Sequence, residues 1–163
     1  MNLSAGQINV SVSYKEAMNL YLTNQQPLTL SKQLGAGGEG TVYALATQAD
    51  VVAKIYHQPP KVRKQAKLGA MAIGCDVDLE KIALWPKALV YDEHQQVLGF
   101  LMPRLPASSL PIHHLYNPSQ RKQDFPKADY AFLVHTARNL AAAFAYLHSC
   151  GHCVGDVNQG NIV

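Results

Sequence analysis

Residues 34–45 read Leu-Gly-Ala-Gly-Gly-Glu-Gly-Thr-Val-Tyr-Ala-Leu, and residues 51–56 read Val-Val-Ala-Lys-Ile-Tyr. The β-forming residues on both sides of the glycines predict two antiparallel strands joined by a tight hairpin, with a third strand over 51–56. Glycines let backbone N–H groups approach an anion closely. A dinucleotide-binding fold is disfavoured because no helix is expected after the glycines, and a P-loop is excluded because no Lys follows them. A glycine-rich hairpin without a ligand stays open as an alternative.

The composition excludes several classes of protein. The chain has 163 residues, of which 48% are hydrophobic and 15% charged, so it is not a disordered tail. Its net charge of +3 is too small to indicate nucleic-acid binding. There is no apolar run long enough for a membrane span and no pattern typical of a signal peptide, so we expect a cytoplasmic protein.

Working outward from the glycines, two further elements are expected near the sheet. Residues 61–73 follow helical spacing, and residues 88–91 and 97–102 predict a second hairpin with its turn at 92–96. The residues that fall on one stripe of this helix are Val62, Ala66, Gly69 and Ile73.

The second half of the chain contains the strongest helical signal, from about Asp129 to His148. Apolar residues occupy most of its faces, so we expect burial on most sides. Before it lies an irregular, proline-rich connector, in which His113 and His114 are expected to face solvent.

Lys54 lies within an apolar strand, where a charge is costly without a partner. Its ammonium group could reach the phosphates of a ligand bound beside the glycine hairpin. The alternative is a lysine that extends its charged end from an edge strand into water, which is common.

A third feature is the loop Gly155-Asp156-Val157-Asn158-Gln159-Gly160-Asn161. The carboxylate of Asp156 could orient a hydroxyl and accept its proton, and the amide oxygen of Asn161 could hold a divalent metal. The alternative is a polar turn whose side chains cap backbone groups.

The order and spacing of these three features resemble the eukaryotic-like protein kinase superfamily, whose motifs are G-x-G-x-x-G-x-V, V-A-I-K and H-R-D-x-x-x-x-N. The resemblance covers about Leu28 to Val163. It implies an α+β fold, with an antiparallel-sheet small lobe and the first helices of a truncated large lobe. The implied domains are an N-terminal extension (1–27), the small lobe with its hinge (28–103) and the start of the large lobe (104–163).

The resemblance also implies a role for each motif residue. Lys54 would hold the α- and β-phosphates of ATP, Asp156 would act as the catalytic base, and Asn161 would bind Mg²⁺. The glycines expected over the phosphates are Gly35, Gly37 and Gly40. The residues expected around the adenine are Val42, Ala53, Met102 and Val163.

The sequence departs from the family pattern in three places. Val154-Gly155-Asp156 replaces His-Arg-Asp, a form that is also similar to aminoglycoside and choline kinases and to a divergent bacterial branch of the superfamily. Residues 61–73 contain no carboxylate to pair with Lys54. Gln65 offers only a neutral contact; the acidic candidates further along are Asp76, Asp78 and Glu80. The family's Asp-Phe-Gly segment is expected beyond Val163.

We therefore expect ATP-dependent phosphoryl transfer to a protein Ser/Thr hydroxyl in the full-length protein, with residues 1–163 alone inactive. One alternative is a small-molecule kinase, and another is a pseudokinase or nucleotide-binding regulatory module, so enzymatic activity itself stays open. The expected cofactors are ATP and Mg²⁺. The expected partners are a protein substrate or regulator and a second copy bound through the exposed large-lobe helix, but neither a membrane nor a nucleic acid.

Overall fold

The computed structural model describes residues 19–74 and 77–163. These residues form two compact units. The first comprises the described residues up to Glu80 together with Leu84–Arg104, and the second comprises Lys81–Ala83 and Leu105–Val163.

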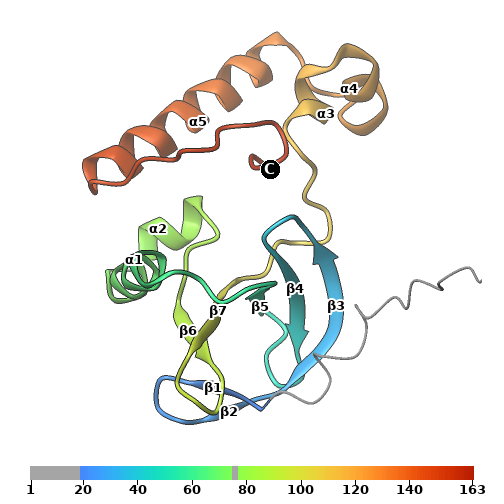
Figure 1. The fold of residues 1–163 in the computed structure, drawn as a ribbon. Coiled ribbons are helices and arrows are strands. Elements are labelled where there is room, and N and C mark those ends of the chain that lie inside the picture. The colour runs from blue at the N-terminus through green and yellow to red at the C-terminus, as the bar shows by residue number, and fades with distance from the viewer. Residues whose placement is uncertain (1–18, 75–76) are drawn as a thin grey trace, which may run out of the picture. The chain divides into compact units, whose positions relative to one another are not determined.

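A seven-stranded sheet forms the first unit, with all neighbouring strands antiparallel and the order β2-β1-β6-β7-β5-β4-β3 (Figure 1). Both predicted hairpins are present, as β3–β4 and β6–β7. The strands are β1 (Leu20–Leu22), β2 (Pro27–Leu28), β3 (Leu30–Ala36), β4 (Gly40–Leu45), β5 (Val51–Tyr56), β6 (Ala88–Tyr91) and β7 (Val97–Pro103).

The sheet begins earlier in the chain than the sequence indicated. Strand β1 pairs with β6 and with β2, although its residues were expected to belong to an N-terminal extension. The turn between β1 and β2 is closed by the Leu22 N–H, which donates to the Gln26 carbonyl at 2.9 Å. The expected boundary between residues 27 and 28 therefore falls inside β2.

Strand β5 lies inside the sheet, between β4 and β7, and separates two apolar clusters. Because side chains alternate along a strand, Ala53 and Ile55 point to one face, and Val52 and Tyr56 to the other. The cluster on the first face consists of Leu20, Leu45, Ala53, Ile55, Val90, Leu98 and Leu101. The cluster on the second face consists of Val52, Tyr56, Leu68, Phe100 and Met102.

Helix α1 (Val62–Ile73) packs against the second face, near β6, and is followed by α2 (Val77–Ile82) (Figure 1). The helix was predicted correctly, but the stripe of apolar residues read from the sequence is not its buried side. Val62 and Ile73 are 80% and 90% exposed, whereas Leu68 is buried in the second cluster. Ala and Gly, which make up the rest of the predicted stripe, have too little side chain to bury, so the larger Leu68 sets the orientation of the helix.

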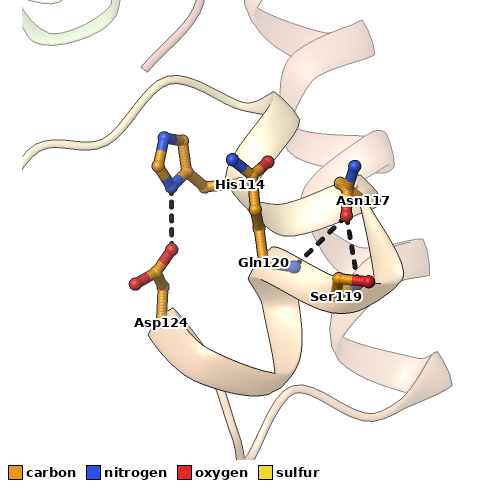
Figure 2. Close-up of polar contacts among 5 residues, drawn as sticks. All are labelled: His114, Asn117, Ser119, Gln120 and Asp124. Atoms are coloured by element: carbon orange, nitrogen blue, oxygen red, sulfur yellow. Dashed lines mark hydrogen bonds and ion pairs between the residues drawn. The ribbon is translucent and has the colours of Figure 1, made fainter.

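The second unit contains three helices, α3 (His113–Tyr116), α4 (Pro118–Asp124) and α5 (Tyr130–Ser149) (Figure 1). Two side-chain caps start the longer ones. Asn117 accepts hydrogen bonds from the backbone N–H groups of Ser119 and Gln120 at the start of α4 (Figure 2). Asp129 accepts one from Phe132 at 2.8 Å, which starts α5 at the predicted position.

The two adjacent histidines do not face solvent as expected, because the connector folds into α3 and α4. His114 Nδ1 lies 2.7 Å from Asp124 Oδ2, which joins the two helices (Figure 2). The ring of His113 lies 4.5 Å from that of His114, centroid to centroid, and its buried Nδ1 has no hydrogen-bond partner within the described ranges.

Helix α5 is less buried than its apolar composition indicated. Leu147 is its one buried residue, while Phe132 and Val134 are 45% and 50% exposed. Across residues 19–74 and 77–163, neither α5 nor another helix combines the length and apolar character needed to cross a membrane.

Candidate functional site

The glycine-rich turn joins β3 to β4 and is closed by a hydrogen bond of 2.9 Å from the Gly37 N–H to the Gly40 carbonyl. Gly40 is buried against β5, and a Cβ at this position would lie 2.5 Å from the Ile55 carbonyl oxygen. Gly35 and Gly37 are exposed and meet no such obstacle. The sheet therefore requires glycine at position 40, whereas positions 35 and 37 remain open toward solvent.

Lys54 lies in β5, directly opposite Val42 in β4 and Phe100 in β7. Directly opposed residues of antiparallel strands project from the same face, so the three side chains lie side by side. Lys54 is half-buried, and its Nζ lies 5.9 Å from the centroid of the Tyr56 ring. The ammonium group is thus held on the face of the sheet that carries the second cluster.

The residues expected around the adenine fall on both faces of the sheet. Val42 and Met102 share the face of Lys54, but Ala53 has no exposed surface and lies in the cluster on the opposite face. Val52 occupies the position on the Lys54 face. The sequence alone could have indicated Val52, because side chains two positions apart in a strand lie on the same face, and Ala53 is only one position from Lys54.

The acidic partner sought for Lys54 does not come from the helix. Gln65 donates its side-chain N–H to the Pro60 carbonyl at 2.7 Å, and Glu80 forms an ion pair of 3.0 Å with Lys87. Asp76 lies outside the described residues. Within residues 19–74 and 77–163, Lys54 forms no ion pair.

A charged pair that no sequence motif indicated lies next to Lys54. Glu39, in the glycine turn, accepts hydrogen bonds from Lys64 of α1 at 3.1 and 3.0 Å. The hydrogen bond from Lys64 and its charge, with a smaller contribution from the charge of Lys54, hold the pKa of the Glu39 carboxyl below its usual value. The Nζ of Lys64 lies 4.4 Å from the centroid of the Tyr56 ring. No spacing rule joins residues 25 positions apart in a hairpin and a helix, so only the acidic residue within the glycines could have drawn attention to the pair.

The loop after α5 brings Asp156 and Asn161 together. Asn161 Nδ2 donates to the backbone carbonyl of Asp156 at 2.9 Å and to its carboxylate at 3.0 Å. Asn158 donates to the other carboxylate oxygen at 2.8 Å and accepts from the Gly160 N–H at 2.8 Å. The carboxylate of Asp156 is thus oriented by two amide groups of its own loop.

One backbone and one side-chain hydrogen bond attach this loop to the two ends of α3. The Ile112 N–H donates to the Ile162 carbonyl at 2.8 Å, and the Tyr116 hydroxyl donates to the side chain of Gln159. Val163, the expected floor of the adenine site, is 57% exposed. The loop is therefore fixed at both Gln159 and Ile162, close to its functional side chains.

The loop offers one oxygen atom that could serve as a ligand for Mg²⁺. Because Asn161 uses its Nδ2 to contact Asp156, its Oδ1 remains available as an oxygen ligand. The described residues contain no cluster of three or more His, Cys, Asp or Glu side chains that could hold a metal. Mg²⁺ commonly keeps several waters and binds through one or two protein oxygens together with phosphate oxygens, and a single amide oxygen suits that mode.

The glycine turn and Lys54 belong to the first unit, and Asp156 and Asn161 to the second. The structure thus describes the geometry of each group, and their convergence on one nucleotide stays a prediction.

No family model matches the chain. The chain is similar to bacterial proteins named as protein kinases. Protein kinase YegI of Escherichia coli strain K12 is 41% identical over 150 residues, which cover 91% of this chain and 23% of that protein. Protein kinase YegI of E. coli O157:H7 is 42% identical over 145 residues, which cover 88% and 22%. The chain thus spans less than a quarter of the length of these kinases, and the similarity includes nearly all of its own length.

Proposed function

We propose that the full-length protein transfers the γ-phosphoryl group of ATP to a Ser or Thr hydroxyl of a protein. The observation that carries this proposal is the shared sheet face of Lys54, Val42 and Met102, next to an open glycine turn. A cation beside an apolar surface suits a ligand with both a phosphate chain and an aromatic base. The names of the two similar proteins support the same class of reaction.

In the proposed nucleotide site, the adenine packs on Val42, Val52 and Met102. Val52 takes the role first assigned to Ala53, because Ala53 lies on the other face of the sheet. Lys54 binds the α- and β-phosphates, and exposed backbone at Gly35 and Gly37 covers them.

In the proposed transfer step, Asp156 orients the acceptor hydroxyl and takes up its proton. The hydroxyl oxygen forms a bond to the γ-phosphorus while the bond from that phosphorus to the ADP oxygen breaks. Asn158 and Asn161 keep the carboxylate in place through their hydrogen bonds. Asn161 Oδ1 is the proposed ligand for Mg²⁺, which when bound neutralises phosphate charge.

The test is phosphate transfer from γ-labelled ATP by the full-length protein, with a general protein substrate and with itself as acceptor. We expect Asp156→Asn to abolish transfer while ATP affinity changes little, and Lys54→Met to reduce both. Asp50→Asn is a matched control, since Asp50 is an exposed carboxylate in the turn directly before β5. Transfer that persists in Asp156→Asn would refute the assigned role.

A second candidate is a nucleotide-binding regulatory module. It is favoured by Lys54, which lacks a carboxylate partner in the described part of the chain. Such a module would be stabilised by ATP, by about 2.7 kcal/mol at a hundredfold excess over the dissociation constant, but would transfer no phosphate. Thermal unfolding with ATP, run beside the transfer assay, separates the two functions.

A further inference from the structure

Two ammonium groups gather around one aromatic ring next to the glycine turn. Lys54 Nζ lies 5.9 Å and Lys64 Nζ 4.4 Å from the centroid of the Tyr56 ring. Lys64 comes from α1, where it precedes the buried Leu68 by one helical turn and therefore faces the sheet. Helix α1 thus directs a positive charge toward the proposed nucleotide site, where the family pattern has a carboxylate.

One carboxylate pairs with Lys64 and lies within the electrostatic influence of Lys54. Glu39 forms a two-oxygen contact with Lys64, and its acidity responds to the charge of Lys54 as well. The three groups together carry one unbalanced positive charge. Glu39 also lies in the turn between the glycines that would cover the phosphates, and its side chain is 67% exposed. The Glu39 carboxylate therefore lies close to both ammonium groups, on a turn that is exposed to solvent.

We propose that Lys64 is a second phosphate-binding residue of the nucleotide site, and that Glu39 occupies it until a nucleotide polyphosphate takes its place. The inference rests on the proposed function, since it requires that this sheet face binds ATP. A triphosphate carries more negative charge than one carboxylate and can contact both lysines at once, so it competes for Lys64. Glu39 is then released, and the tip of the glycine turn with it.

The proposal predicts that removing the charge of Lys64 and removing the charge of Glu39 change ATP affinity in opposite directions. Lys64→Gln removes a phosphate contact, so ATP binding should weaken by about tenfold. Glu39→Gln removes the competitor, so ATP binding should tighten by up to about fivefold. Both side chains are substantially exposed, so neither variant is expected to unfold the protein.

The experiment is calorimetric titration of the full-length protein and its variants with ATP in the presence of Mg²⁺, and with adenosine as a probe without phosphates. Adenosine binding should be unchanged in both variants. Lys67→Gln is the matched control, because Lys67 is exposed on the same helix and its replacement changes the net charge equally.

Two outcomes would overturn the proposal. If Lys64→Gln and Glu39→Gln shift ATP affinity in the same direction, the pair only shapes the turn. If Lys64→Gln binds ATP like Lys67→Gln, Lys64 does not contact phosphate. Failure of the underlying function looks different, because the unmodified protein would then bind no ATP and Lys54→Met would change nothing.

Discussion

Glu39 Oε2 in the glycine turn lies 3.0 Å from Lys64 Nζ in helix α1. In the family pattern that the sequence resembles, an acidic residue on the helix pairs with the strand lysine, but the helix of this chain offers no such residue. The charges are instead exchanged between helix and hairpin, because every charged residue in 61–73 is basic and the turn provides the acid. The pair joins the two segments that border the proposed phosphate site.

The Tyr56 phenol reports on this arrangement. Burial raises the pKa of Tyr56 above its usual value of 10.0, while Lys64 lowers it and Glu39 raises it. We therefore expect Lys64→Gln to raise the pKa of Tyr56 and Glu39→Gln to lower it. NMR titration of ¹³Cζ-labelled tyrosine measures both pKa values. If the pKa of Tyr56 shifts in the same direction in both variants, or in neither, the two charges do not act on the ring as described.

The same pKa predicts a loss of stability in alkali. A pKa raised in the folded state means that the folded chain holds the phenolic proton more tightly than the unfolded chain does. The stabilisation is complete below pH 10.0 and is lost as the pH rises through the folded pKa. Urea unfolding across this range should show a steeper alkaline loss for the unmodified protein than for Tyr56→Phe.

Gly40 and Gly37 should differ sharply in their tolerance of a methyl group. Gly40→Ala places a Cβ against the Ile55 carbonyl and should cost about 1–3 kcal/mol of unfolding free energy. Gly37→Ala has its nearest obstacle at 4.0 Å and should stay within about 0.5 kcal/mol. Denaturant unfolding measures both, and equal losses would contradict the packing described for the turn.

Leu68 and Ile73 test which side of α1 is buried. Leu68 is 6% exposed in the second cluster, so Leu68→Ala should cost about 2–5 kcal/mol. Ile73 is 90% exposed, and Ile73→Ala should change stability by no more than about 0.5 kcal/mol. A larger loss at Ile73 than at Leu68 would restore the stripe that the sequence indicated.

Substitutions of Val52 and Ala53 test which face of β5 binds the adenine. Val52→Ala and Ala53→Gly both remove buried apolar atoms, so both should lower the stability of the first unit. Only Val52→Ala should weaken ATP binding, by about threefold to tenfold, because Val52 lies on the Lys54 face. Calorimetric titration with ATP measures the affinity of both variants. If Ala53→Gly weakens ATP binding more than Val52→Ala does, the adenine contact belongs to Ala53.

The sequence predicted the elements whose signals are local. The glycine hairpin, β5 and α5 follow from β-forming residues, turn glycines and the helical spacing of apolar residues, each within a short window. Strand β1 was missed because it has three residues and gains its stability by pairing with β6, a partner far along the chain. The orientation of α1 was missed because it depends on the apolar patch beneath Leu68.

The site shows the same division between local and distant information. Asp156 and Asn161 share a loop, so their proximity follows from the short spacing between them. The contact between Glu39 and Lys64 needs the hairpin and the helix to be placed first, and no motif records it. The face on which Val52 lies could have been predicted from the sequence, because side chains alternate along a strand and Val52 is two positions from Lys54.

Strand β5 has hydrogen-bonded neighbours on both sides, β4 and β7, and α1 packs over the same sheet. Gly99 of β7 approaches the Lys54 carbonyl so closely that no side chain would fit between them. The backbone of Lys54 consequently has little freedom to shift, and its ammonium group can be re-aimed only by rotation about its own side-chain bonds. If the proposed nucleotide site is correct, any backbone adjustment to nucleotides of different phosphate number would come from the hairpin tip that carries Glu39, while the backbone of Lys54 stays in place.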